Sequence, residues 1–284
     1  KGTLGASSDI TVSGDSSTGI LINGASTGTP ASLKYGGNVS VTGNGVSGII
    51  VGDNDTGKAE VTVENDGTVT VNNGTSTSAG IYEYMEGANK KKQGSYGIIV
   101  SKDSKLVSDG THDINADINV KGQESVGLYT GENAKLDVKD HTVKAYEGAV
   151  NYDAEKGSTL TLTGTGTATT GQKSLLFYTG SDNANQGKVL INGTMTATVE
   201  GGTTPNTRGN AFLYVGNGGD FGKSEIEDWA KNNFGDGKNT TLGHLTLNMN
   251  SGSRLFIAQN VKMNLSDTTG NTVSTATGAH INGT

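Results

Sequence analysis

Aromatic and cationic side chains are concentrated between Tyr82 and Tyr96, in a chain that is otherwise acidic. Three tyrosines (Tyr82, Tyr84 and Tyr96) and three consecutive lysines (Lys90, Lys91 and Lys92) fall within these residues. Aromatic rings anchor many recognition surfaces, and an ammonium group can pair with an acidic partner. We therefore expect residues 82–96 to form a protruding loop that binds a sugar or an acidic partner. The alternative is a solvated loop whose lysines only improve solubility.

A second irregular segment, residues 216–243, contains the only tryptophan of the chain. A capping box begins at Ser224, and apolar residues then recur at helical spacing as far as Phe234, which predicts a short amphipathic helix. Within this segment, the candidate residues for binding a partner are Phe221, Trp229 and Phe234. The same helix could instead dock on the main body, because an isolated helix of this length needs tertiary packing to persist.

Catalytic motifs are incomplete in this sequence. Gly14-Asp15-Ser16-Ser17 is similar to the nucleophile segment of chymotrypsin-like proteases, but Ser17 stands where that motif has glycine. A possible phosphate loop ending at Ser224 has Asn217 in place of its first required glycine. The four histidines lie far apart, and cysteine is absent. We predict no catalytic residue, no metal site and no cofactor.

A short sequence motif repeats along the chain, and the structure that it forms must position the two irregular segments. Its clearest copy is Ser125-Val126-Gly127-Leu128-Tyr129-Thr130. Further copies lie at residues 17–21, 47–51, 78–82, 95–100, 148–152, 174–178 and 210–214. The glycines that we align are Gly19, Gly48, Gly80, Gly97, Gly127 and Gly148. This spacing is typical of a solenoid with one repeat per turn.

Short alternating strands such as Val61-Thr62-Val63 follow most copies, so valines face inward and hydroxyls face water. Pairs such as Asn44-Gly45 and Asn192-Gly193 could provide positive φ at the bends. Hairpins are the alternative, but the same apolar triplet returns only after a full repeat. The sequence predicts one all-β domain over residues 1–284, a right-handed parallel β-helix with one short helical insertion. We expect the apolar residues after each glycine to form an inner ladder, with Thr and Ser outside.

Composition agrees with this fold. Glycine accounts for 45 of 284 residues, against a usual share of about 7%, and proline occurs twice. The net charge of −7 argues against nucleic acid as a partner. No run approaches 18 consecutive apolar residues, so we expect the segment not to be embedded in a membrane. The repeat pattern continues to both ends, which predicts a piece of a longer protein.

The recurring Ser-Val-Gly-Leu-Tyr motif, followed by a turn and a strand such as Ala134-Lys135-Leu136-Asp137-Val138, resembles the passenger domains of type V (monomeric) autotransporters, in particular the large fusobacterial-type adhesins. The resemblance covers residues 15–215. It implies a β-helix displayed at the bacterial cell surface or secreted, with an outer-membrane β-barrel at the C-terminus of the parent chain.

The same resemblance implies an adhesin associated with virulence. Its partners would be a host-cell receptor or glycan, or another bacterial surface. Two other functions stay open. The segment could be a stalk that holds a distal binding head, and regular units without protrusions would favour that reading. It could also be a carbohydrate-active β-helix enzyme, but such enzymes cluster acidic and basic residues around a groove, whereas Thr, Ser, Asn and Lys dominate the outward positions here. We therefore expect a binding protein and not an enzyme.

Overall fold

The computed structural model describes residues 2–3, 8–24, 31–52, 57–73, 82–86, 89–179, 181–182, 185–201, 245–250, 253 and 272–275. These residues form strands and turns without any helix. They build three parallel sheets of seven, nine and six strands, which we name A, B and C, and two short antiparallel hairpins. The all-β prediction is confirmed for this part of the chain. The helix expected within residues 216–243 lies outside it.

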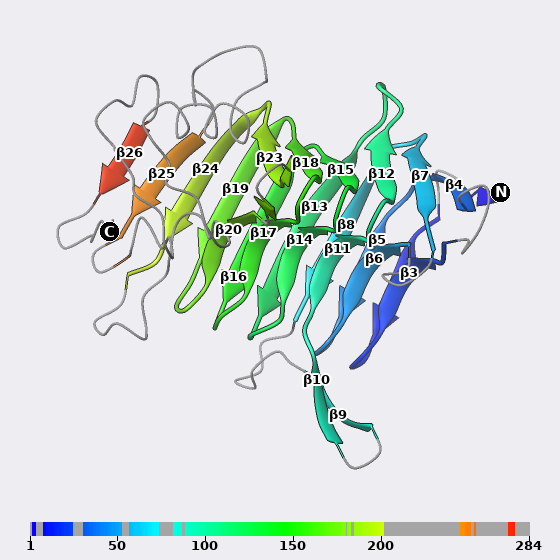
Figure 1. Ribbon diagram of the computed structural model, residues 1–284, viewed down its shortest axis with the longest axis horizontal. Helices are drawn as coiled ribbons and strands as arrows, with labels where there is room; N and C mark the ends of the chain where they lie inside the picture. Colours follow the sequence, from blue (N-terminus) through cyan, green and yellow to red (C-terminus); the bar gives the residue numbers. More distant parts are fainter. Residues whose placement is uncertain are drawn as a thin grey trace.

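The three sheets share the strands in rotation, so that the chain passes from B to C to A and then returns to B (Figure 1). Sheet A contains β1 (Gly2–Thr3), β4 (Ala31–Tyr35), β7 (Ala59–Val63), β12 (Lys105–Ser108), β15 (Lys135–Val138), β18 (Thr159–Leu162) and β23 (Lys188–Ile191). Sheet B contains β2 (Ile10–Ser13), β5 (Val39–Thr42), β8 (Gly67–Asn72), β13 (Ile114–Lys121), β16 (His141–Tyr146), β19 (Thr165–Thr170), β24 (Thr194–Val199), β25 (Leu245–Met249) and β26 (Thr272–Thr275). Sheet C contains β3 (Thr18–Ile22), β6 (Ser47–Val51), β11 (Tyr96–Val100), β14 (Val126–Thr130), β17 (Val150–Ala154) and β20 (Leu175–Thr179). We call one strand from each sheet, taken in this rotation, a unit.

One hydrophobic core lies between the three sheets. Leu128 of sheet C, Leu136 of sheet A and Val143 of sheet B are each 0% exposed and belong to the same buried cluster. On either side of Leu136 and Val143 the residues are more exposed, as expected when side chains alternate between the two faces of a strand. Every unit therefore adds a narrow layer to a continuous core.

Glycine is required where sheet C approaches sheet B. The pairing register aligns Gly19, Gly48, Gly97 and Gly127 in one column. A Cβ atom on Gly127 would lie 2.4 Å from Cγ1 of Val143, which is closer than any real contact. The next position of the column is Asn151, and there the position of Val143 on sheet B is taken by the smaller Ala168. Asn151 uses the space to accept a hydrogen bond from Oγ1 of Thr170 and to donate to the carbonyl of Thr169.

The register corrects the alignment of two repeats. Gly148 is not the equivalent of Gly127, because Asn151 occupies that column. No strand lies between β6 and β11 in sheet C, because the two pair directly, and Tyr82, the only described residue of the copy at residues 78–82, belongs to β9. Glycine spacing alone cannot reveal either point, because backbone pairing and not residue type sets the register.

The bends also differ from the expectation that Asn-Gly pairs supply them. Gly45 has a positive φ of 61°, but Gly193 has none. Several bends instead place a non-glycine residue in the left-handed region, as at Asp103 (φ 57°) and Asn133 (φ 57°). Asn133 is the third residue of a tight turn in which the Ala134 N–H donates to the Gly131 carbonyl at 2.9 Å. Asp and Asn tolerate this conformation better than most residues, which explains their presence at these bends.

Candidate functional site

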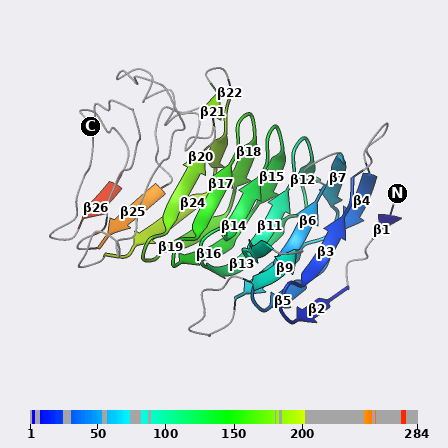
Figure 2. The ribbon, with the colours of Figure 1, turned by 60° about the horizontal axis from the view of Figure 1, so that its bottom comes forward.

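The outer face of sheet C carries a row of large apolar and aromatic residues that one aspartate interrupts. The six strands of this sheet lie side by side (Figure 2). Pairing aligns one residue from each of them, and we name this set the outer row of sheet C. Its members are Leu21, Ile50, Ile99, Tyr129, Asp153 and Tyr178. Leu21 is 56% exposed, and Ile50, Ile99, Tyr129 and Tyr178 are only partly buried. This contradicts our expectation that all apolar residues after the glycine face inward.

The strand geometry explains why the outer row was missed. In the stretch at residues 125–130, Leu128 points into the core and is 0% exposed, so its neighbour Tyr129 lies on the opposite face. Successive apolar residues in a strand indicate that both faces are apolar, whereas strict alternation indicates one wet face. The consecutive apolar residues at 49–51 and 98–100 already indicated strands with two apolar faces.

Tyr96 belongs to the same outer face. It is the first residue of β11, and its ring lies edge-on to that of Tyr129 with centroids 6.3 Å apart. Burial raises the pKa of both phenols, and the nearby Asp153 carboxylate adds to that rise. Tyr96, one of the residues predicted to bind, thus lies beside another aromatic side chain on this face.

Asp153 lies between Tyr129 and Tyr178 in the outer row. Its side chain is buried, and its Oδ1 atom has no hydrogen-bond partner among the described residues. Burial holds the pKa of Asp153 well above its ordinary value, and repulsion from Glu155 contributes in the same direction. A carboxyl group in this setting favours its neutral form, which can donate a hydrogen bond as well as accept one.

The segment from residue 82 to residue 93 is a β-hairpin, a more regular structure than the predicted loop. β9 (Tyr82–Glu86) and β10 (Asn89–Gln93) pair antiparallel, with Tyr84 opposite Lys91. The hairpin projects away from the three sheets (Figure 1), and backbone pairing within it replaces the hydrogen bonds that stacking would supply. β21 (Ser181–Asp182) and β22 (Asn185–Gln186) form a second, shorter antiparallel pair.

Gln93 anchors the base of the longer hairpin to the units before it. Its Nε2 atom donates to the carbonyl of Gly45 at 2.7 Å, and its Oε1 atom accepts from Ser16 Oγ at 3.0 Å. The hairpin therefore carries Tyr82, Tyr84 and Lys90–Lys92, whereas Tyr96 lies beyond it in sheet C. Phe221, Trp229 and Phe234, the other predicted binding residues, lie outside the described residues.

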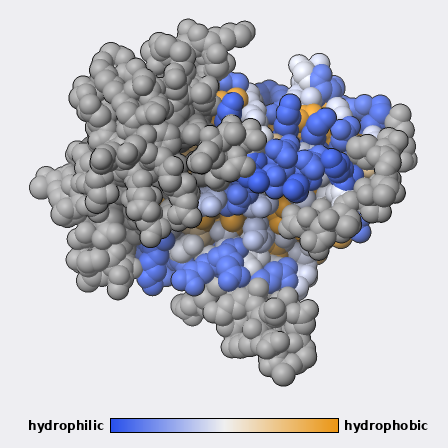
Figure 3. Space-filling model, in the orientation of Figure 1, coloured by the Kyte–Doolittle hydropathy of each residue, from blue (hydrophilic) through white to orange (hydrophobic). Residues whose placement is uncertain are grey.

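The outer face of sheet A is charged. Ion pairs on it and at its borders connect neighbouring units, for example Lys105 Nζ to Glu60 Oε1 at 2.9 Å and Lys102 Nζ to Glu132 Oε2 at 2.9 Å. Hydrophilic residues also cover much of the described surface in the view of Figure 3, with small hydrophobic areas between them. Sheets A and C thus expose different chemistry although they share one core.

Comparisons with known proteins identify no relative. No protein-family model matches the chain, and neither a curated protein nor a solved structure is significantly similar to it. Within the described ranges, no helix has the length and apolar character needed to cross a bilayer. The same residues include no group of three or more histidine, aspartate or glutamate side chains placed to hold a metal ion.

Proposed function

We propose that sheets A, B and C are the three faces of a right-handed parallel β-helix. The rotation of strands among the sheets supports this, because each unit contributes one strand to every face before the chain returns. Right-handedness follows from the general preference of parallel crossovers, of which about 98% are right-handed. Equivalent strands then stack about 4.8 Å apart along the axis.

This β-helix acts as a surface-displayed adhesin segment of the autotransporter kind, located at the bacterial cell surface. Its role is binding and not catalysis, and its partner is a host-cell receptor or glycan or another bacterial surface. The observation that carries the proposal is the hairpin β9–β10, which leaves the stacked sheets while β6 and β11 pair across its insertion point. Because no backbone pairing within the stacked sheets depends on this hairpin, its residues can vary to suit a binding partner.

The position of the hairpin also supports the proposed binding function. Gln93 fixes its base, and Tyr96 follows three residues later on the outer face of sheet C, in contact with Tyr129. The hairpin and the outer row of sheet C thus lie in the same part of the chain. Aromatic anchors dominate the energetics of many interfaces, and both elements supply tyrosines.

A deletion of residues 83–92, joined by a short Gly-Ser linker, tests the adhesin function while keeping Gln93. Beads coated with the wild-type chain should adhere to cultured epithelial cells or to partner bacteria, and the deletion should abolish this adhesion. A variant with Tyr84→Ser and Lys91→Ser should weaken adhesion without changing the length of the chain. Lys144→Ala, an exposed lysine of sheet B, is the matched control and should adhere like the wild type.

Circular dichroism and thermal unfolding decide whether the deletion acts on binding or on folding. The β signal and the midpoint of unfolding should be nearly unchanged, because no pairing within sheets A, B or C involves residues 83–92. Unchanged adhesion of the deletion variant would reject the hairpin as the binding element and favour a stalk.

A further inference from the structure

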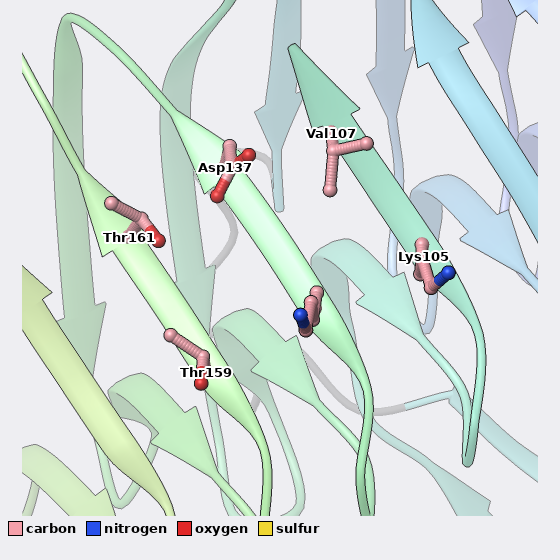
Figure 4. A pocket seen from close by; sticks show the side chains of 6 residues that line it. Lys105, Val107, Asp137, Thr159 and Thr161 are labelled. Carbon is pink, nitrogen blue, oxygen red and sulfur yellow. The ribbon is translucent and has the colours of Figure 1, made fainter.

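A shallow groove crosses the outer face of sheet A, away from the aromatic face of sheet C. It has a volume of about 410 Å³ and spans β12, β15 and β18 (Figure 4). Its lining consists of Lys105, Val107, Lys135, Asp137, Thr159 and Thr161. We propose that this groove binds a carboxylated oligosaccharide, with its sugar units along the axis of the stack. The site is separate from the hairpin and does not depend on the proposed adhesion through it.

The first side of the groove is cationic. Lys105, Lys135 and Thr159 are consecutive partners in the register of sheet A. Lys105 is held by Glu60 of the preceding unit, whereas Lys135 is exposed and forms no salt bridge among the described residues. Lys135 is therefore available to pair with an incoming carboxylate, and Lys105 adds a second positive charge on the neighbouring strand.

The second side of the groove offers groups that bind hydroxyls. The Thr161 hydroxyl and the Ser108 N–H both lie near the Asp137 carboxylate and favour its ionised form. An ionised carboxylate has about four acceptor positions, so Asp137 keeps capacity for sugar hydroxyls. Burial raises the pKa of Asp137, while the nearby Thr161 hydroxyl, the Ser108 N–H and Lys135 oppose that rise.

These two sides together select the ligand class. A simple anion would use the lysines but gain nothing from Asp137, which would repel it if placed nearby. A neutral sugar would use Asp137 and Thr161 but leave Lys135 unpaired. A carboxylated sugar satisfies both sides, with its acid toward Lys135 and its hydroxyls toward Asp137. A pyranose unit is also about as long as the spacing of neighbouring strands, ~4.8 Å, so successive units can meet successive strands.

Binding of trigalacturonate to the full 284-residue chain, measured by titration calorimetry, tests the proposal. We expect saturable binding in low salt that weakens as salt rises, because the ion pairs are exposed. The methyl-esterified trimer, which keeps the hydroxyls but loses the charges, should bind at least about tenfold more weakly, as should galactotriose. That factor is the loss expected when one charge-assisted contact is removed.

Variants locate the site. Lys135→Ala should lower the affinity about tenfold, and Thr161→Val, which removes one hydroxyl, should lower it several-fold. Lys144→Ala on sheet B is the matched control and should bind like the wild type. The hairpin deletion should also bind trigalacturonate normally, which separates this site from the proposed adhesion. No binding at millimolar trigalacturonate, equal binding of the methyl ester, or equal losses for Lys135→Ala and Lys144→Ala would each overturn the proposal.

Discussion

The outer row of sheet C contains Ile50, Ile99 and Tyr129, whereas the same units place Glu60, Lys105 and Lys135 on the outer face of sheet A. Both sheets have parallel strands with one shared core beneath them. Their outer surfaces are nevertheless opposite in character. The fold requires only that one face of each strand is apolar, so the other face is free to diverge.

Two aspartates make the contrast concrete. Asp137 on sheet A is half-buried, but the Thr161 hydroxyl, the Ser108 N–H and Lys135 all lie close enough to lower its pKa. Asp153 on sheet C is buried, lacks a partner for Oδ1 and is repelled by Glu155. The same side chain is thus supported on one sheet and isolated on the other, because the surrounding residues differ.

The largest effects should appear where the two sheets are alike. Leu128→Ala on sheet C and Leu136→Ala on sheet A each remove a side chain that is 0% exposed, so each should lower the free energy of unfolding by about 2–5 kcal/mol. Denaturant unfolding measures both. Thr142→Ala on the outer face of sheet B should change it by less than about 0.5 kcal/mol. A loss for Thr142→Ala as large as that for Leu128→Ala would mean that the two faces are misassigned.

The next effect should separate the sheets. Asp153→Leu removes a buried carboxyl group with an unpaired oxygen, and should raise the free energy of unfolding at neutral pH by about 1–3 kcal/mol. Asp137→Leu should instead lower it by about 0.5–1.5 kcal/mol, because the Thr161 hydroxyl and the Ser108 N–H would lose the carboxylate beside them. If both substitutions changed stability in the same direction, the contrast between the two carboxylates would be wrong.

The dependence of stability on pH gives a further test of Asp153. Its pKa in the folded protein lies above that in the unfolded chain, so the folded state binds the proton more tightly. Stability is therefore lost as the pH rises above the unfolded pKa of about 3.9 and continues to fall up to the folded pKa. Unfolding of the wild type and of Asp153→Asn, compared across this range, should show a difference that grows with pH. A constant difference would contradict the raised pKa.

The sequence alone predicted those features of the structure that depend on residue periodicity and composition. Alternation in stretches such as Val61-Thr62-Val63 predicted strands with one buried face, and the recurring glycines predicted repetition. It did not predict features that depend on contacts between residues of different units. Asn151 can replace glycine only because Ala168 stands where an earlier unit has Val143, and that exchange is visible only once the register is known.

The candidate site shows the same limit. Tyr96 was identified from its place in an unusual segment, but its contact with Tyr129 depends on the pairing of β11 with β14. The groove on sheet A was not predicted, because Lys105, Lys135 and Thr161 come from three units and no local motif links them. A ladder of parallel strands assembles sites across repeats, so residues that act together are about one full repeat apart.

The smallest expected effect concerns the forces that join adjacent units on the outer faces. Lys105 and Glu60 form an ion pair across sheet A, and Ile99 and Ile50 occupy the matching positions of the same two units on sheet C. Double-mutant cycles to alanine should give a coupling energy of about 0.2–1 kcal/mol for each pair at low salt.

Salt should then distinguish the two pairs. Because both members of the Lys105–Glu60 pair are exposed, 1 M NaCl shortens the screening length to about 3 Å and should remove most of their coupling. The coupling of Ile50 with Ile99 arises from apolar contact, which NaCl does not screen, so it should persist. If the coupling in sheet A survived at high salt, direct packing and not charge would connect these units, and the outer faces of the two sheets would differ in composition but not in the forces between their strands.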